Sequence, residues 1–180
     1  MFSKGKFYLI GFHGCDQEIR DKIVLHQAKF KESVNDYDWL GHGIYFWEND
    51  YERAFQWAKE KKKNPAVIGA LIESGNCLDL LEQSSKERLK TGYDMLKDKF
   101  PDNLPKNKWG KDHLLRNLDC AVINTLCEHY LKKFAFIFDS VRGAFGKETN
   151  CIPVQQSKKK VTYKFVSEIL NVSKPYLSHK

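Results

Sequence analysis

The sequence predicts an α+β domain built around a mixed or antiparallel sheet. Short apolar runs that are typical of strands dominate both ends of the 180-residue chain, and the longest helical patterns lie between them. The predicted order is strand, helix, strand, helix, strand, two helices and then strands, an arrangement that favours α+β architecture. A chain of this length is expected to form a single domain, residues 1–180, and to bury about 70% of the surface that its unfolded form exposes.

The first half of the chain combines strand-like runs with short helical patterns. The predicted elements are a strand at 7–12, a helix from a cap at Asp16 to about Leu25, a polar loop over a cleft at 29–40, a strand at 43–47, a helix from a cap at Asn49 or Asp50 to about Lys62, and a strand at 66–72. The apolar face expected for the second helix consists of Tyr51, Ala54, Phe55 and Ala58. Asn64-Pro65 ends that helix, and Gly75-Asn76 predicts a turn.

The second half begins with two helical patterns and ends with strand-like runs. The predicted elements are a helix at about 81–100, a break at 101–105, a helix at about 111–132, and strands at 134–138, 152–154 and 161–170. The second of these helices has an apolar stripe at i, i+3 and i+4 spacing, formed by Leu114, Leu115, Leu118, Val122, Leu126 and Tyr130.

Composition excludes several classes of protein. A hydrophobic content of 42% and an aromatic content of 13% suit a globular core and argue against disorder. No apolar run approaches the ~20 residues of a membrane span, and the N-terminus enters a strand without the apolar region of a signal peptide. The five cysteines contain no C-x-x-C pair, so neither a metal site nor a redox motif is expected. Free thiols fit a reducing compartment, and the expected location is cytoplasmic, with no membrane partner.

The net charge of +7 and the pI near 9.1 predict attraction to polyanions such as nucleic acids. Simple solubility explains the same excess of lysine, and both interpretations stay open at this point. Lysines are concentrated at 59–63, where they are expected to complement the C-terminal dipole of a helix, and at 158–160, where a solvated hairpin loop is expected.

Two short motifs carry the strongest functional signal. Phe12-His13-Gly14 ends the first strand-like run, and the segment 39–48, which contains Gly43-Ile44-Tyr45-Phe46-Trp47, opens a second one. An imidazole can bond a ligand hydroxyl, and glycine lets a ligand approach the backbone. Flat rings on alternating faces of a strand suit a nucleotide-like ligand with a planar ring. Two ordinary core strands, each with a turn residue, explain the same pattern.

The two motifs together resemble the H-Y-E class of ADP-ribosyltransferases, which includes the poly(ADP-ribose) polymerases and the diphtheria-toxin-like enzymes. The segments 35–48 and 138–145 resemble the small bacterial and phage members, and the matches are scattered over residues 7–170. The resemblance implies a split β-sandwich with flanking helices and NAD, as co-substrate, in the cleft between the sheets. Neither a P-loop nor a G-x-G-x-x-G motif is present.

The resemblance also implies roles for particular residues. His13 would bond the adenosine-ribose hydroxyl, Gly14 would bond the nicotinamide amide through its backbone, and Tyr45 would stack on the nicotinamide ring. A glutamate near the fifth strand would bond the nicotinamide ribose and steer the acceptor. Glu148 is the only carboxylate between Asp139 and Glu168 and is therefore the candidate, although its register is shifted.

Four further residues are secondary candidates for this site. Glu48, just after the Tyr45 strand, is the alternative to Glu148 as the catalytic carboxylate. Ser33 is a candidate contact of the adenine ribose, and Trp47 is a candidate second wall of the pocket. Arg142 can bond a phosphate or pair with Asp139 in a structural salt bridge.

The favoured function is NAD-dependent mono-ADP-ribosylation of a macromolecule, either single-stranded RNA or DNA or else a protein. The resemblance implies that such small basic enzymes are toxins or antiphage effectors, for which an antitoxin or inhibitor protein is a candidate partner. An NAD glycohydrolase on the same scaffold and a non-catalytic basic domain that binds nucleic acid or protein are the alternatives.

Overall fold

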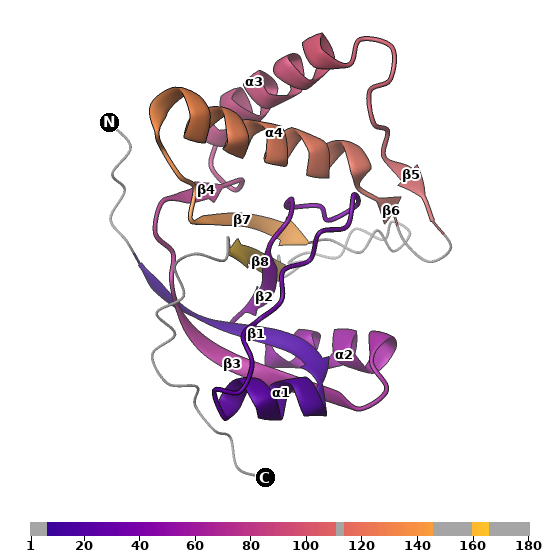
Figure 1. Ribbon diagram of the computed structural model, residues 1–180, viewed down its shortest axis with the longest axis vertical. Helices are drawn as coiled ribbons and strands as arrows, with labels where there is room; N and C mark the ends of the chain where they lie inside the picture. Colours follow the sequence, from indigo (N-terminus) through magenta and orange to yellow (C-terminus); the bar gives the residue numbers. More distant parts are fainter. Residues whose placement is uncertain (1–6, 111–113, 146–159, 166–180) are drawn as a thin grey trace, which may run out of the picture.

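The structure is a computed structural model and describes residues 7–110, 114–145 and 160–165 (Figure 1). Its elements are β1 (Tyr8–Asp16), α1 (Gln17–Val24), β2 (Ile44–Glu48), α2 (Tyr51–Lys61), β3 (Pro65–Glu73), β4 (Cys77–Asp79), α3 (Ser84–Lys99), β5 (Lys108–Trp109), β6 (Leu114–Leu115), α4 (Asn117–Phe134), β7 (Ser140–Phe145) and β8 (Lys160–Phe165).

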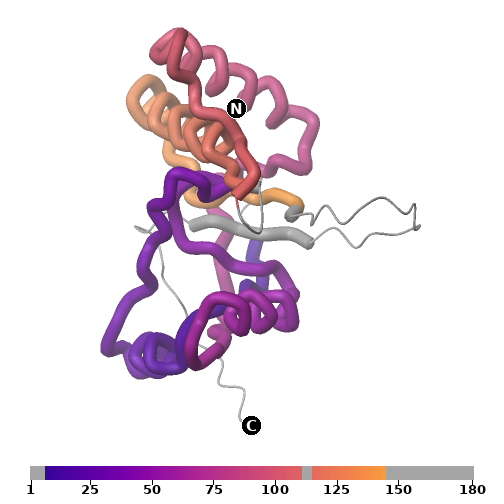
Figure 2. The backbone as a smooth tube through the Cα atoms, turned by 90° about the vertical axis from the view of Figure 1, so that its right-hand side faces the viewer, coloured from indigo at the N-terminus to yellow at the C-terminus, as the bar shows by residue number. Residues whose placement is uncertain are grey.

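Six strands form one mixed sheet in the order β3-β1-β2-β8-β7-β4. Every neighbouring pair is antiparallel except β4 and β7, which are parallel. Helices α3 and α4 lie side by side at one end of the molecule, and α1 and α2 lie at the other end beside β1 and β3 (Figures 1 and 2). The prediction of an α+β arrangement with a mixed sheet and flanking helices is therefore confirmed.

The buried side chains form two main clusters, which meet at β2. The first consists of Leu9, Ile44, Phe46, Ala70 and Ile72. The second consists of Leu40, Leu78, Ile123, Leu126, Phe138 and Val141, with Tyr45 packed against it. Successive side chains of a strand point to opposite faces, so this short strand contributes to both cores.

Most predicted elements are confirmed with small shifts at their ends. Asp50 caps α2, since its Oδ1 accepts from the Arg53 backbone N–H at 2.9 Å. Asp16 stands at the predicted cap position of α1, but its carboxylate accepts from the Asn64 backbone N–H at 3.0 Å instead. The lysines at 59–63 overlap the end of α2 as expected, with Lys59 and Lys61 in its last turn.

The predicted strand at 134–138 is wrong. Helix α4 continues to Phe134 and ends at Ala135, which has a left-handed φ of 50°. The apolar run is explained by an aromatic cluster on the helix, because the ring centroid of Phe138 lies 5.0 Å from that of Tyr130. The strand β7 begins two residues later, at Ser140.

Two helix predictions also need correction. The predicted start of the last helix is too early, because Leu114 and Leu115 form β6 and α4 begins at Asn117. On α2 the buried side chains are those of Arg53, Ala54 and Ala58, whereas Tyr51 is exposed. The predicted strand at 152–154, residues 166–170 of the last predicted strand and the lysines at 158 and 159 lie outside the described residues.

In the described part of the chain, no helix is long and apolar enough to cross a membrane. The described cysteines, Cys15, Cys77, Cys120 and Cys127, are free thiols.

Helices α3 and α4 touch at a glycine. A Cβ on Gly92 would lie 3.0 Å from both the Leu126 Cβ and the Val122 carbonyl oxygen. Glycine inside a helix is unfavourable by about 1 kcal/mol relative to alanine, so close packing is the physical reason for its presence here. We predict that Gly92→Val lowers the free energy of unfolding by about 2 kcal/mol, because the added methyl groups force the helices apart.

Urea unfolding monitored by circular dichroism measures this change. Thr91→Val is the matched control, because Thr91 is the exposed neighbour on the same helix. Equal unfolding free energies for the two variants would show that Gly92 is not a packing contact.

Candidate active site

Strands β1 and β2 separate at the His-Gly motif. Strand β1 pairs with β3 along its whole length, but it pairs with β2 only through Gly11↔Glu48 and Phe12↔Trp47. Beyond Phe12, the edge of β1 that faces β2 therefore has no strand partner within the described residues. A backbone edge that no strand occupies can donate to and accept from a ligand. His13 and Gly14 lie at the start of this open edge.

The His13 ring bridges the two strands where they separate. Its Nδ1 lies 2.8 Å from the Tyr45 carbonyl oxygen. Because a carbonyl can only accept, Nδ1 carries the proton and Nε2 of the neutral ring is left as an acceptor. Burial lowers the pKa of His13, the bond to the Tyr45 carbonyl opposes this, and the positive charge of Lys62 lowers it further. His13 is thus neutral near pH 7 and presents an acceptor that suits a ligand hydroxyl.

The hydroxyl of Tyr45 is held by the loop that precedes its strand. It donates to the Gly41 carbonyl oxygen at 2.8 Å and accepts from the Leu40 backbone N–H at 3.1 Å. Burial raises the pKa of Tyr45, and the negative charge of Asp38 adds to the effect. The phenol therefore stays protonated, and Tyr45 can offer a flat ring surface but no acid–base chemistry.

Gly14 is required by the packing of α2 against β1. A Cβ at this position would lie 2.5 Å from the Ala54 carbonyl oxygen and 3.0 Å from the Trp57 Cε3. Trp57 thus lies against the His-Gly segment of β1, and the Nζ of Lys62 lies 5.4 Å from its ring centroid. The sequence interpretation missed Trp57, although its place one helical turn after Ala54 puts it on the face of α2 that turns toward β1.

Ser33 pairs with the first residue before β2. The Ser33 and Gly43 backbones form an antiparallel bridge with two hydrogen bonds of 2.9 Å, and the Ser33 hydroxyl accepts from Asn35 Nδ2 at 2.9 Å. The same loop is held by α4, since the His42 backbone N–H donates to Asn124 Oδ1 at 3.0 Å. The bridge places Ser33 beside the start of the Tyr45 strand.

Arg142 lies within β7 and joins two carboxylates from other strands. Its Nη1 lies 3.0 Å from Asp79 Oδ2, and its Nη2 lies 3.2 Å from Glu48 Oε2. Asp139, the partner suggested by sequence proximity, accepts from the Asn76 backbone N–H at 2.7 Å. Glu48, the alternative catalytic carboxylate, is thus neutralised by an arginine, and a phosphate would have to compete with both carboxylates for Arg142.

The last two sequence candidates are Trp47 and Glu148. Trp47 is buried, and the Arg53 Cζ lies 4.7 Å from the centroid of its ring. Glu148 lies outside the described residues, three positions after the end of β7. Among the described side chains, no group of three or more His, Cys, Asp or Glu is arranged to hold a metal ion.

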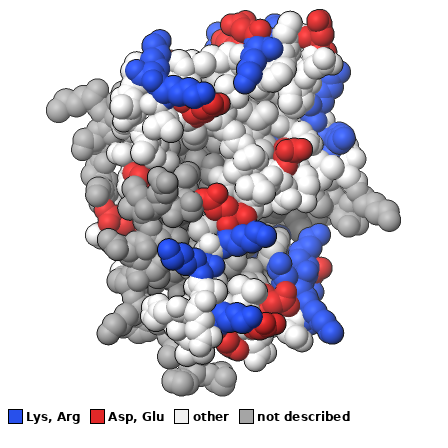
Figure 3. All heavy atoms as spheres, in the orientation of Figure 1, with Lys and Arg blue, Asp and Glu red and all other residues white. Residues whose placement is uncertain are grey.

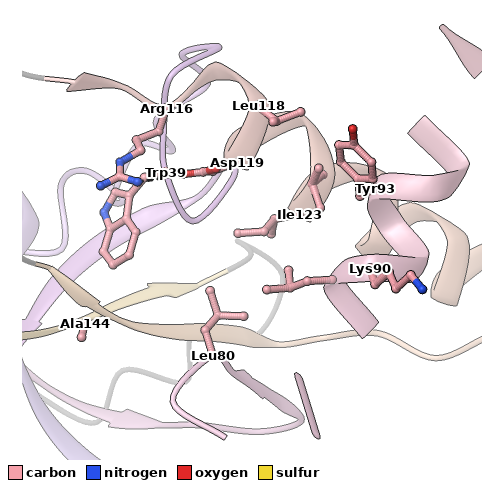
Figure 4. Close-up of a pocket in the computed structure, with 11 residues that line it drawn as sticks. Trp39, Leu80, Lys90, Tyr93, Arg116, Leu118, Asp119, Ile123 and Ala144 are labelled. Atoms are coloured by element: carbon pink, nitrogen blue, oxygen red, sulfur yellow. Dashed lines mark hydrogen bonds and ion pairs between the residues drawn. The ribbon is translucent and has the colours of Figure 1, made fainter. Parts of the chain in front are cut away.

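A cavity of about 530 Å³ lies beside the cluster into which Tyr45 packs, and neither His13 nor Gly14 lines it. Its walls come from the loop before β2, from α3 and α4, and from β7 (Figure 4). They include Trp39, Leu80, Tyr93, Arg116, Ile123 and Ala144.

The chain is 31% identical over 160 residues to the uncharacterized protein MJ0359 of Methanocaldococcus jannaschii. The alignment covers 82% of this chain and 67% of that protein. No protein-family model matches the chain, and no solved structure matches it. The name of the relative states no activity, so function has to be argued from the side chains.

The neutral state of His13 predicts a specific dependence of stability on pH. In the unfolded chain its imidazole takes up a proton near pH 6.5, whereas the lowered pKa keeps it neutral to lower pH in the folded state. The unfolded state then binds more protons, so this contribution to stability is present above about pH 6.5 and is lost as the pH falls. We expect His13→Asn, which keeps an N–H donor for the Tyr45 carbonyl but does not titrate, to lose less stability than the parent between about pH 7 and pH 5.

The measurement is the urea midpoint of both proteins at the two pH values, with His129→Asn, at a half-buried histidine on α4, as the control for the same substitution elsewhere. Identical pH dependence of the parent and His13→Asn would contradict the buried, neutral assignment.

Proposed function

This chain belongs to the family of the Methanocaldococcus jannaschii protein MJ0359, and we propose that it is a mono-ADP-ribosyltransferase that uses NAD as donor. One observation carries the proposal: the His13 Nδ1 bonds the Tyr45 carbonyl at the point where β1 and β2 part. This bond joins the histidine and the tyrosine strand of the H-Y-E pattern at one place, next to an open backbone edge. In the proposal, the separation of the strands is the opening of a split β-sandwich.

The donor would be held by three groups near this opening, with the His13 ring on the Phe46 face of the sheet and the Tyr45 ring on the opposite face. The unprotonated Nε2 of His13 accepts a hydrogen bond from the adenosine-ribose hydroxyl. The backbone of Gly14, on the open edge, bonds the nicotinamide amide, and the ring of Tyr45 offers a stacking surface whose position the Leu40 and Gly41 backbones hold. Ser33, Trp47 and Arg142 remain candidates for the adenine ribose, a second wall and a phosphate.

The reaction breaks the bond between C1′ of the ribose and the nicotinamide nitrogen. The electron pair of that bond leaves with the nicotinamide, which becomes neutral, while a cation-like ribose develops. A nucleophile of the acceptor forms the new bond to C1′ and gives up a proton to water. A nearby carboxylate stabilises the developing charge. We assign this role to Glu148, and the engagement of Glu48 by Arg142 supports that choice.

The acceptor is proposed to be a macromolecule, with single-stranded nucleic acid preferred over protein. Figure 3 shows Lys and Arg side chains over α3 and α4 at the top of the view and along the lower right side, mixed with acidic ones. The net charge of +7 adds long-range attraction to phosphates. Extension of a chain of ADP-ribose units would need further acceptor-binding structure, so single transfer is proposed. A cytoplasmic toxin or antiphage role, opposed by an antitoxin or inhibitor protein, fits this chemistry.

The direct test is incubation with labelled NAD and separate pools of RNA, DNA and protein. Label on a macromolecule supports a transferase, and free ADP-ribose alone indicates a glycohydrolase. No consumption of NAD in any pool would rule out the proposal.

Tyr45 provides the test of the donor site. We expect Tyr45→Ala to weaken NAD binding by about 1 kcal/mol beyond the loss of buried area, because the stacking surface is gone. Tyr45→Phe is the matched control: it keeps the ring but loses the hydroxyl bonds to Leu40 and Gly41, so stability falls by about 1 kcal/mol while NAD still binds. Isothermal titration calorimetry measures the affinities for NAD, and urea unfolding measures the change in stability. A folded Tyr45→Ala protein with the parent's affinity for NAD would remove Tyr45 from the site.

Glu148 provides the test of the chemical step. Glu148→Gln keeps the shape of the side chain and removes its charge, so transfer should fall by roughly 100-fold while NAD binding is retained. Glu48→Gln is the contrasting variant, and its main effect should be on stability because Arg142 loses a charged partner. Single-turnover rates and thermal midpoints separate the two effects. An unchanged rate in Glu148→Gln would transfer the role to Glu48.

A further inference from the structure

The cavity of about 530 Å³ beside Trp39 is large enough for a nucleobase with its ribose (Figure 4). None of the residues assigned above to NAD lines it. It is bounded on one side by Trp39 and on the other by Tyr93, with Leu80 and Ile123 between them. Two aromatic side chains around an apolar interior suit a flat, unsaturated ring.

Charged groups at the cavity give it a preference for anions. Lys90 and Arg116 are the basic residues of the lining, and Asp119 is the acidic one. The Asp119 carboxylate is already shared, since its Oδ2 lies 3.3 Å from Arg116 Nη1 and its Oδ1 accepts from Asn107 Nδ2 at 2.9 Å. Lys90 is exposed, and its ammonium group points away from the cavity interior, at the Tyr93 end of the lining (Figure 4). A ligand with a flat ring inside the cavity and a phosphate on either side of that ring matches this combination.

The cavity shares its wall with the Tyr45 side of the proposed donor site. Trp39, Leu80 and Ile123 line the cavity and also belong to the cluster into which Tyr45 packs. Trp39 is followed directly by Leu40, whose backbone N–H donates to the Tyr45 hydroxyl. Both residues rest on β7, because a Cβ on Gly143 would lie 2.9–3.0 Å from their side chains. An occupant of the cavity therefore contacts the same loop that holds Tyr45.

We propose that this cavity is the acceptor site and that it takes an unpaired base of a single-stranded nucleic acid, stacked on Trp39, with one flanking phosphate at Arg116 and the other outside the cavity at Lys90. The catalytic part of this inference rests on the proposed function, and the binding part does not. The base supplies the nitrogen or oxygen whose lone pair bonds C1′ as nicotinamide leaves with its electron pair, and the proton of the acceptor passes to water. Single strands are preferred because their bases need not be unpaired or extruded from a duplex.

The test is the affinity for short fluorescein-labelled single-stranded RNA and DNA oligonucleotides, measured by anisotropy without NAD. Trp39→Ala should weaken binding by about 10-fold or more because a base loses its stacking surface. Lys90→Gln should weaken binding and lower the slope of log K against log salt by about 1, as expected for one phosphate contact.

Matched controls exist for both changes. Trp109 is a 70% exposed tryptophan outside the cavity, and Lys97 is an exposed lysine further along α3. Trp109→Ala and Lys97→Gln should bind oligonucleotide like the parent. Because Trp39 packs on Gly143, its loss could disturb folding, so Tyr93→Ala on the opposite, half-buried wall provides a second variant that should also weaken binding.

The results separate this inference from the proposed function. Parent-like oligonucleotide affinity in folded Trp39→Ala, Tyr93→Ala and Lys90→Gln proteins would overturn it. The inference would also be overturned if these variants lost affinity for NAD but kept their affinity for the oligonucleotide, because the cavity would then belong to the donor site. Label from NAD found only on protein would also overturn it. If the parent consumes no NAD, the proposed function fails, and the anisotropy still decides whether the cavity binds nucleic acid.

Discussion

The alternation of β2 is the constraint on which the rest of the structure depends. Ile44 and Phe46 are buried in one core, and Tyr45 between them packs into the other. A shift of one residue in the pairing of β2 would exchange these side chains and bury the phenol hydroxyl away from the loop that satisfies it. The register is therefore strongly specified, and both halves of the molecule are built on one short strand.

Polar contacts reinforce the same strand at both ends. At its start, the loop that holds the Tyr45 hydroxyl is tied to α4 through His42 and Asn124. At its other end, Glu48 is paired with Arg142, which also reaches Asp79 in β4. Through Arg142, these ion pairs connect β7 to both β2 and β4, and removal of one charged partner would leave a partly buried charge uncompensated. Helix α4 at one end of β2, and strands β7 and β4 at the other end, thus hold in place the strand that carries Tyr45.

Local patterns predicted the elements well because their causes are local. Asp50 caps α2 as expected, and Asn64-Pro65 lies between α2 and β3. The run from Phe134 to Phe138 was misassigned because a short apolar run suits a strand and a helix end equally, and only its packing on Tyr130 decides. The His-Gly and tyrosine motifs were found because each is contiguous in the sequence.

The partners within the site could not be read from the sequence, because they lie far apart along the chain. Arg142 binds a residue 63 positions away and another 94 positions away, and nothing local marks Asp79 or Glu48 as those partners. The bond from His13 to Tyr45 ends on a backbone carbonyl, which no residue pattern reveals. The sequence did not reveal Trp57, because its contact with Gly14 depends on how closely α2 packs against β1 in the folded protein.

The close approach of α2 to Gly14 has an evolutionary consequence. Any side chain at that position would collide with the Ala54 carbonyl, so glycine is needed for folding whether or not a ligand is bound. A descendant that had lost its ligand would still be under selection to keep Gly14. At position 13, by contrast, an asparagine could donate to the Tyr45 carbonyl and preserve the fold, so loss of function would leave that position free to drift. Within this family, the history of the histidine is therefore more informative about activity than the history of the glycine beside it.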